Sequence, residues 1–136
     1  MTSFPLKIVT PDGLEYDGKA EEVCVRTTTG ELGVLAGHLN MVAPLGMGTA
    51  TIVIDGKKRY AACIGGMITV MNKEVTLVPT TFEWAEEIDV KRAEASEARA
   101  QKILANKTAD ATELRMAEAR LKRALIRQST ASYTKL

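Results

Sequence analysis

A change of pattern near Glu83–Asp89 constrains the fold most, because it divides the 136-residue chain into two different kinds of sequence. Before it, apolar and polar residues alternate in short runs separated by Gly, Pro and Asp-Gly, which is typical of half-buried strands. After it there is no Gly or Pro, and helix-forming residues dominate up to Arg127. We therefore predict an α+β chain, with an N-terminal antiparallel β-sandwich over residues 1–84 and a C-terminal antiparallel two-helix hairpin over residues 85–136.

The first part contains short runs with the period of a strand. They are Leu6–Ile8, Leu14–Tyr16, Val23–Val25, Thr49–Ile54, Arg59–Ile64, Met67–Met71 and Val75–Val78. Turn signals separate several of them: Pro11-Asp12-Gly13, Asp17-Gly18, Asp55-Gly56 and Asn72-Lys73. Many short strands with frequent turns predict a sandwich or a flattened barrel. Gly65-Gly66, between two such runs, is read as a bulge or a close approach of two backbones.

An apolar segment with several glycines, Gly30–Leu45, lies between the strand runs and has two interpretations. It can be ordinary sandwich packing with bulges at the glycines, or a docking surface around His38. No Lys-Ser/Thr follows the glycines, so a phosphate-binding P-loop is excluded. His38 is the only histidine, and no nucleophile or paired carboxylate stands at a recognisable spacing from it. We therefore do not expect an enzyme.

Composition narrows the class of function further. The net charge is +1 and the pI is about 7.7, so no global charge directs the chain to nucleic acid or membrane. Cys24 and Cys63 each lie in an apolar run, which favours buried thiols, and no Cys/His spacing predicts a metal site. There is no leader-like N-terminus and no apolar run of the ~20 residues that a bilayer span needs. We expect a cytosolic or peripheral protein without direct membrane insertion.

Two helices are predicted in the second part. The first covers Asp89–Ala105 and begins with Asp89 as N-cap or in the first turn; Asn106–Asp110 interrupts it. Asp110, three residues before Glu113, is a variant of the capping box and starts the second helix. The apolar stripe of this helix consists of Leu114, Ala117, Leu121, Ala124 and Leu125. Because alanine buries little surface, the hairpin is expected to be weakly held, either as a mobile element or simply as a loose one.

Arginines are placed regularly on both helices. Arg120, Arg123 and Arg127 share one face of the second helix, and Arg92 and Arg99 share a face of the first. If these faces meet, their guanidinium groups form a site suited to phosphate. The alternative is a solvated charged surface in which the arginines pair with nearby carboxylates. The candidates are Glu94, Glu97 and Glu118.

Several stretches, in order and over the whole length, resemble the epsilon subunits of bacterial F-type ATP synthases. They are Val9-Thr10-Pro11-Asp12-Gly13, Gly30-Glu31-Leu32-Gly33-Val34-Leu35 with Gly37-His38, Val42-Ala43-Pro44-Leu45, Gly65-Gly66 and Ile88-Asp89-Val90-Lys91-Arg92-Ala93. The resemblance implies a non-catalytic rotor subunit on the cytoplasmic face of the bacterial cell membrane, peripheral, in a synthase driven by protons or sodium ions.

The resemblance also implies partners. The sandwich is expected to bind the gamma subunit and the c-ring, through a surface that includes Glu31, His38, Met41 and Val42. The hairpin is expected to take two positions. Folded down, it packs on the sandwich; extended along gamma, it reaches the alpha and beta catalytic subunits and blocks ATP hydrolysis. In this chain Ala36 stands where the family often has proline before Gly-His.

A regulatory ATP site is the third implication. Ile88, Asp89, Arg92 and Ala93 match the family's ATP-binding motif, and further family contacts fall on Glu83, Arg99, Arg123 and Arg127. Met116 stands where the family often has an arginine, and Arg115 precedes it, turned by about 100° on a helix. Because arginines supply the positive charge, magnesium is not expected to be required. The alternative function is a generic anion-binding module with a partner such as nucleic acid. Steep salt dependence of binding and tolerance of any polyanion would favour this alternative. As a synthase subunit, the chain is expected to bind no nucleic acid.

Overall fold

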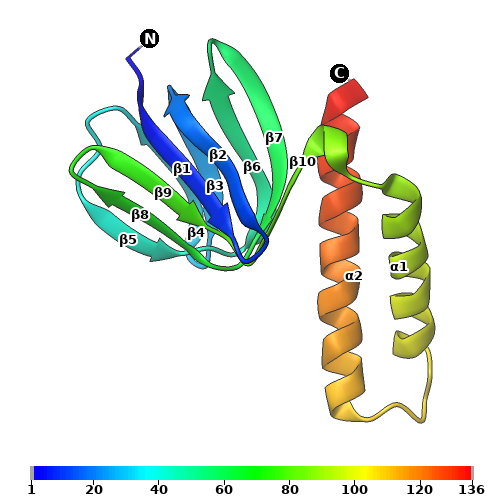
Figure 1. Cartoon of the computed structure of the whole chain (residues 1–136). Helices are drawn as coiled ribbons and strands as arrows, with labels where there is room; N and C mark the ends of the chain where they lie inside the picture. Colours follow the sequence, from blue (N-terminus) through cyan, green and yellow to red (C-terminus); the bar gives the residue numbers. More distant parts are fainter. Residues whose placement is uncertain (1, 136) are drawn as a thin grey trace. The chain divides into compact units, whose positions relative to one another are not determined.

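The computed structural model describes residues 2–135 and divides into two compact units, Met1–Trp84 and Ala85–Leu136 (Figure 1). The first unit is built from strands. They are β1 (Phe4–Thr10), β2 (Gly13–Ala20), β3 (Glu22–Thr27), β4 (Gly30–Leu35), β5 (Met41–Pro44), β6 (Met47–Ile54), β7 (Lys57–Ile64), β8 (Met67–Met71), β9 (Glu74–Val78) and β10 (Thr81–Trp84). They form two five-stranded sheets, in the orders β2-β1-β9-β8-β5 and β10-β7-β6-β3-β4. The predicted sandwich is confirmed. One pairing, between β1 and β9, is parallel; the other strand pairs are antiparallel.

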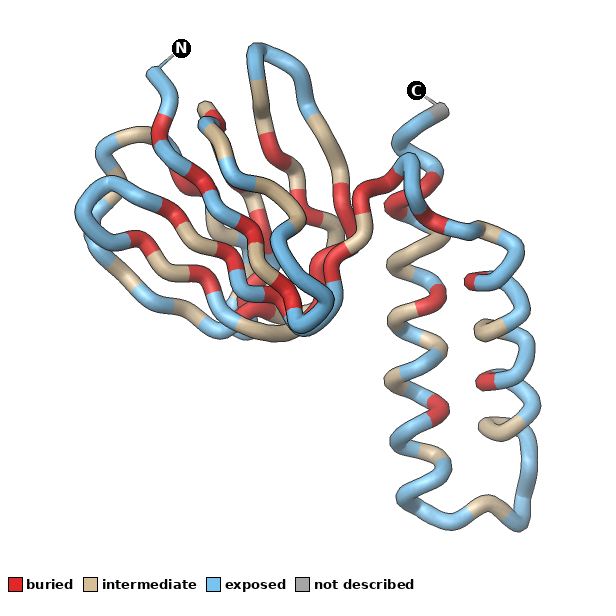
Figure 2. The backbone as a smooth tube through the Cα atoms, in the orientation of Figure 1, coloured by how far each residue is buried: buried red, intermediate tan, exposed pale blue. Residues whose placement is uncertain are grey.

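The core of the sandwich consists mainly of aliphatic side chains. Figure 2 shows buried residues recurring along the strands of both sheets. Each of the following is exposed by 1% or less: Leu6, Ile8, Ile68, Val70 and Leu77 from the first sheet, and Val23, Val25, Val34 and Ile52 from the second. Full burial of such a side chain stabilises a fold by about 1.5–3 kcal/mol. The period-two pattern of the sequence is therefore the pattern of this core.

Two predicted hairpin turns are confirmed by the backbone. Asp55 and Gly56 have φ of 52° and 75°, and Asn72 and Lys73 have φ of 51° and 69°. Positive φ at both central residues is the type I′ geometry, which matches the twist of the paired strands. The close backbone approach predicted at Gly65-Gly66 is also present, because a Cβ atom on Gly66 would lie 1.9 Å from the carbonyl oxygen of Val78.

The turn predicted at Asp17-Gly18 is wrong. β2 continues through both residues, with Asp17 opposite Lys7 and Gly18 opposite Leu6 on β1. The glycine serves a neighbouring side chain instead: the hydroxyl of Tyr16 donates to the carbonyl oxygen of Lys19 at 2.7 Å, and a Cβ on Gly18 would lie 2.8 Å from that hydroxyl. β4 and β5 form within the segment Gly30–Leu45, whose glycines interrupt the period-two pattern.

The second unit is a helical hairpin, as predicted (Figure 1). It contains η1 (Ala85–Glu87), α1 (Val90–Leu104), α2 (Ala111–Ser132) and η2 (Tyr133–Lys135). Both predicted N-caps are confirmed, because Asp89 Oδ1 accepts the backbone N–H of Arg92 at 3.1 Å and Asp110 Oδ1 accepts that of Glu113 at 2.8 Å. These bonds satisfy N–H groups that the first helical turn leaves without an intrahelical partner.

Alanines fill the interface between the two helices. Ala93 and Ala100 on α1, and Ala117 and Ala124 on α2, are each exposed by 2% or less. They recur every seventh residue, so on each helix they form one narrow stripe. The inclusion of Leu125 in this stripe is wrong: it is 46% exposed, because it lies about 100° around the helix from Ala124. Small side chains let the helices approach closely but bury little apolar surface.

Candidate functional site

A cleft on the hairpin brings arginines from both helices together. It has a volume of about 350 Å³. Its lining residues are Ser96, Arg99, Ala100 and Ile103 from α1, with Arg120 and Arg123 from α2. The lining therefore contains guanidinium groups and one hydroxyl but no carboxylate. Several fork-shaped donors around a space without a carboxylate are suited to a phosphate-bearing ligand.

Helical periodicity explains why these side chains converge. On α1, Arg92, Ser96, Arg99 and Ile103 are spaced by four, three and four residues, so they form one row. On α2, Arg120, Arg123 and Arg127 form the corresponding row. Ala100 is 1% exposed and lines the cleft, and its small side chain leaves space between the two arginine rows. Arg92 and Arg127 do not line the cleft, but they continue its two rows toward the first turn of α1.

The alternative, in which carboxylates neutralise these arginines, is not what the hairpin shows for the cleft. Across residues 2–135, Arg99, Arg120 and Arg123 form no ion pair. The carboxylate of Glu97 instead accepts hydrogen bonds from the side-chain amides of Gln101, at 3.3 Å, and Gln128, at 2.8 Å. The second of these bonds joins the two helices. Carboxylates of the described residues therefore do not neutralise the arginines that line the cleft.

The remaining residues of the predicted ATP motif lie around the start of α1. Asp89 is the exposed N-cap, Ile88 before it is 9% exposed, and Ala93 is fully buried in the helix interface. Glu83 belongs to β10 of the sandwich unit and is half-buried. The structure thus gives Asp89 and Ala93 structural roles in the hairpin, and a contact of either with ATP stays a prediction.

The predicted partner-contact residues are spread over several elements of the sandwich. Glu31 on β4 is exposed and forms a surface ion pair with Arg26 at 3.5 Å. His38 lies in the loop after β4, with Nδ1 placed 2.9 Å from the carbonyl oxygen of Leu39. Met41 packs against the core, whereas Val42 on β5 is 57% exposed. Of these side chains, Val42 presents the most apolar surface.

An exposed apolar row, which the sequence pattern alone does not reveal, crosses the outer face of the first sheet. Pro44 on β5 pairs with Met67 on β8, which pairs with Val78 on β9. The parallel register of β1 with β9 ends at Ile8 opposite Leu77, so Val9 and Val78 are the next residues of the two strands; Val9 pairs with Leu14 on β2. Met67, Val78 and Leu14 are 39%, 45% and 61% exposed. A continuous exposed apolar surface is typical of a protein interface.

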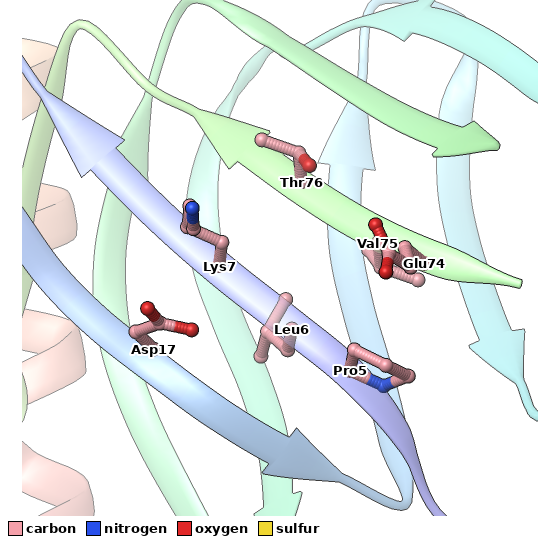
Figure 3. Close-up of a pocket in the computed structure, with 7 residues that line it drawn as sticks. All are labelled: Pro5, Leu6, Lys7, Asp17, Glu74, Val75 and Thr76. Carbon is pink, nitrogen blue, oxygen red and sulfur yellow. The ribbon is translucent and has the colours of Figure 1, made fainter.

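A polar groove of about 220 Å³ lies on the same face (Figure 3). Figure 3 shows Lys7 on β1 between Asp17 on β2 and Thr76 on β9. Glu74 adds a second carboxylate. Lys7 is two residues from Val9, so the groove borders the apolar row. Its mixed charges resemble the polar rim of an interface more than the site of one small ligand.

The thiols fit a structural role. Burial raises the pKa of the Cys63 thiol to about 12, and burial is also the main cause of the raised pKa of Cys24. A thiol with a raised pKa is a poor nucleophile at neutral pH.

Among the described residues there is no cluster of three His, Cys, Asp or Glu side chains placed to hold a metal ion. Within the same residues, neither helix has the length and hydropathy to cross a bilayer.

Comparison with known proteins identifies the family. A family model described as the β-sandwich domain of the ATP synthase delta/epsilon chain matches residues 3–85, and one described as its long α-helix domain matches residues 86–132. An ATP synthase epsilon chain of Bacillus velezensis is 43% identical over 96% of this chain and 98% of its own length. One from Ruminococcus albus is 41% identical, over 97% of this chain and 98% of its own length.

Solved structures share the fold. A chain of the Euglena gracilis mitochondrial ATP synthase superposes with a TM-score of 0.82 at 23% identity, covering 95% of this chain and 81% of that one. A chain of the Tetrahymena thermophila mitochondrial ATP synthase, in a structure of its central stalk and c-ring, gives a TM-score of 0.61 at 12% identity, over 93% and 95%. At these identities the similarity concerns the fold alone. The two family matches and the relatives above 40% identity go further, and the chain belongs to the delta/epsilon chain family of ATP synthases.

Proposed function

We propose that the chain is a non-catalytic central-stalk subunit of an F-type ATP synthase, which couples gamma to the c-ring during ion-driven ATP synthesis. Membership of the delta/epsilon family supports this role, as do the bacterial epsilon chains that it resembles over nearly their whole length. We further propose that the chain lies at the cytoplasmic face of a bacterial cell membrane, as a peripheral part of the complex.

The proposed docking surface for gamma is the apolar row from Pro44 to Leu14. A row that crosses all the strands of one sheet offers an extended contact, and its polar border at Lys7 and Asp17 resembles an interface rim. For the c-ring we propose the exposed Glu31 and the loop around His38. These two residues lie on the strand β4 and just beyond it, apart from the apolar row in the strand order.

The hairpin is proposed to bind ATP and thereby to regulate ATP hydrolysis. The single observation that carries this proposal is the cleft in which Arg99, Arg120 and Arg123 meet without a carboxylate. In the proposed mechanism, ATP binds the folded-down hairpin and not the extended one, which contacts alpha and beta and inhibits hydrolysis. A hundredfold excess of ATP over Kd then stabilises the folded-down form by about 2.7 kcal/mol.

Calorimetric titration of the isolated protein tests the ligand. ATP is expected to bind with measurable heat, and GTP more weakly, because the family motif at Asp89 is expected to contact the base. Short RNA and other polyanions serve as controls for the alternative of a generic anion-binding module. Equal binding of every polyanion, with a steep loss of affinity as salt rises, would reject ATP as the specific ligand.

Magnesium provides a second test of the same site. The arginine rows supply the positive charge that Mg²⁺ supplies at many nucleotide sites, so we expect free ATP to bind at least as tightly as Mg-ATP. Titrations with ATP in EDTA and in excess MgCl₂ measure the difference. Clearly tighter binding of Mg-ATP would contradict the proposal that arginines alone neutralise the phosphates.

A further inference from the structure

Arg120 lines the cleft, although neither the family motif nor the predicted ATP contacts include it. It is exposed, and in the described part of the chain it forms no ion pair. Met116, one turn earlier on the same face of α2, is apolar and 51% exposed. The basic row of α2 therefore begins at Arg120. Ser96 contributes a hydroxyl from the facing helix.

The row of side chains on α1 makes the two ends of the site chemically different. Asp89, Arg92, Ser96 and Arg99 share one face, and about 15 Å of helix separates the first from the last. A carboxylate such as that of Asp89 only accepts hydrogen bonds, so it repels phosphate but suits the donor groups of a base or ribose. Arginines from both helices meet at the other end, around Arg99. The terminal phosphates, which carry the most negative charge, are therefore held best at the end of the site around Arg99.

We infer that Arg120 and Ser96 complete, with Arg99 and Arg123, the subsite for the terminal phosphates of the nucleotide. This inference rests on the proposed binding of ATP to the hairpin. Arg120 binds the terminal phosphates through its fork of N–H donors, and Ser96 donates its hydroxyl from the opposite side of the cleft. Arg120 therefore sets the preference of the hairpin for ATP over AMP.

The test compares ATP and AMP binding in Arg120→Ala and in a matched control, Arg115→Ala. Both changes remove one exposed arginine from the same helix, but Arg115 does not line the cleft. Calorimetry is expected to show that Arg120→Ala weakens ATP binding about tenfold, as loss of a charge-assisted bidentate contact does, and leaves AMP affinity within about twofold. Arg115→Ala is expected to keep the ATP/AMP ratio of the unchanged protein.

Two further variants refine the result. Arg120→Lys keeps the charge but not the fork, so we expect it to recover only part of the ATP affinity. Ser96→Ala is expected to weaken ATP binding about threefold, again with little effect on AMP. Circular dichroism checks that each variant keeps its helix content, which Arg120→Ala has no reason to lower because alanine is the best helix former.

The outcomes separate this inference from the proposed function. If the unchanged protein binds no ATP, the proposed function fails and the subsite fails with it. If the unchanged protein binds ATP and Arg120→Ala binds it equally tightly, the subsite is wrong while ATP binding stands. An equal loss of ATP and AMP affinity would also overturn the assignment of Arg120 to the terminal phosphates.

Discussion

At the scale of single residues, Asp89 and Arg92 show how a short motif serves a helix and a proposed ligand together. Asp89 Oδ1 accepts the backbone N–H of Arg92 at 3.1 Å, which fixes the first turn of α1. The guanidinium of Arg92 therefore starts from a well-defined backbone position on the row that leads to the cleft. The cap leaves the side chain of Arg92 available to the nucleotide.

The first prediction concerns this arginine. Arg92→Ala is expected to weaken ATP binding at least tenfold, about 1.4 kcal/mol, because it removes one positive charge from the arginine row of α1. Lys91→Ala is the matched control, since Lys91 is an exposed cation one residue away that points to a different side of the helix. Calorimetric Kd values measure both. An unchanged Kd for Arg92→Ala would leave this residue with a structural role only.

The second prediction concerns Gly66, where the backbone of the sandwich leaves no room for a side chain. Gly66→Ala is expected to cost about 3 kcal/mol of unfolding free energy, because Cβ would meet the carbonyl oxygen of Val78 and φ is +89°. Gly37→Ala is the control: its φ is +84°, but nothing lies within 4 Å of the added atom, so only the conformational cost of about 1 kcal/mol remains. Urea denaturation measures the difference; equal costs would contradict the steric explanation.

At the scale of elements, the alanine stripe decides both the stability and the shape of the hairpin. Ala93, Ala100, Ala117 and Ala124 hold α1 and α2 close together, which brings the arginines of the two helices to one cleft. The same stripe contributes little hydrophobic free energy. In the proposed mechanism, this weak packing would let the hairpin bind ATP in one position and leave that position at modest cost.

Ala100→Leu tests this balance. The larger side chain is expected to push the helices apart, destabilise the hairpin by about 1–3 kcal/mol and weaken ATP binding, because the arginine rows separate. Ala98→Leu adds the same atoms to an exposed position of α1 and should do neither. Thermal melting followed by circular dichroism, together with ATP titration, measures both effects. Tight ATP binding by Ala100→Leu would show that the cleft does not depend on the close approach of the helices.

At the scale of the whole molecule, the face of the first sheet connects the fold to the proposed assembly. Met67→Lys is expected to abolish binding to gamma, because it places a charge within the apolar row, while changing the stability of the isolated protein by no more than about 0.5 kcal/mol. Leu35→Lys, an exposed apolar position on the second sheet, is the control. Co-purification with gamma measures binding, and retention of Met67→Lys in the complex would rule out the row as the docking surface.

The sequence predicted the features whose signals are contained in a few neighbouring residues. The Asp55-Gly56 turn needs only its own positive φ angles, and the cap at Asp89 needs only the next turn of helix. The strand through Gly18 was missed because its glycine accommodates Tyr16, which no turn rule takes into account. The apolar row was missed because it depends on the register of β1 with β9, which are far apart in the chain. Arg120 was placed on the correct helix face, but its convergence with Arg99 required the packing of two helices.

The parallel pairing of β1 with β9 has a consequence for synthesis of the protein. Among the strands of the sandwich, β1 leaves the ribosome first, yet one of its two neighbours, β9 (Glu74–Val78), is among the last. Until then the nascent chain carries β1 with one hydrogen-bonding edge open, and such an edge readily pairs with other chains. The first sheet therefore cannot be completed before β9 has been synthesised, and until then the open edge of β1 is exposed to pairing with other chains.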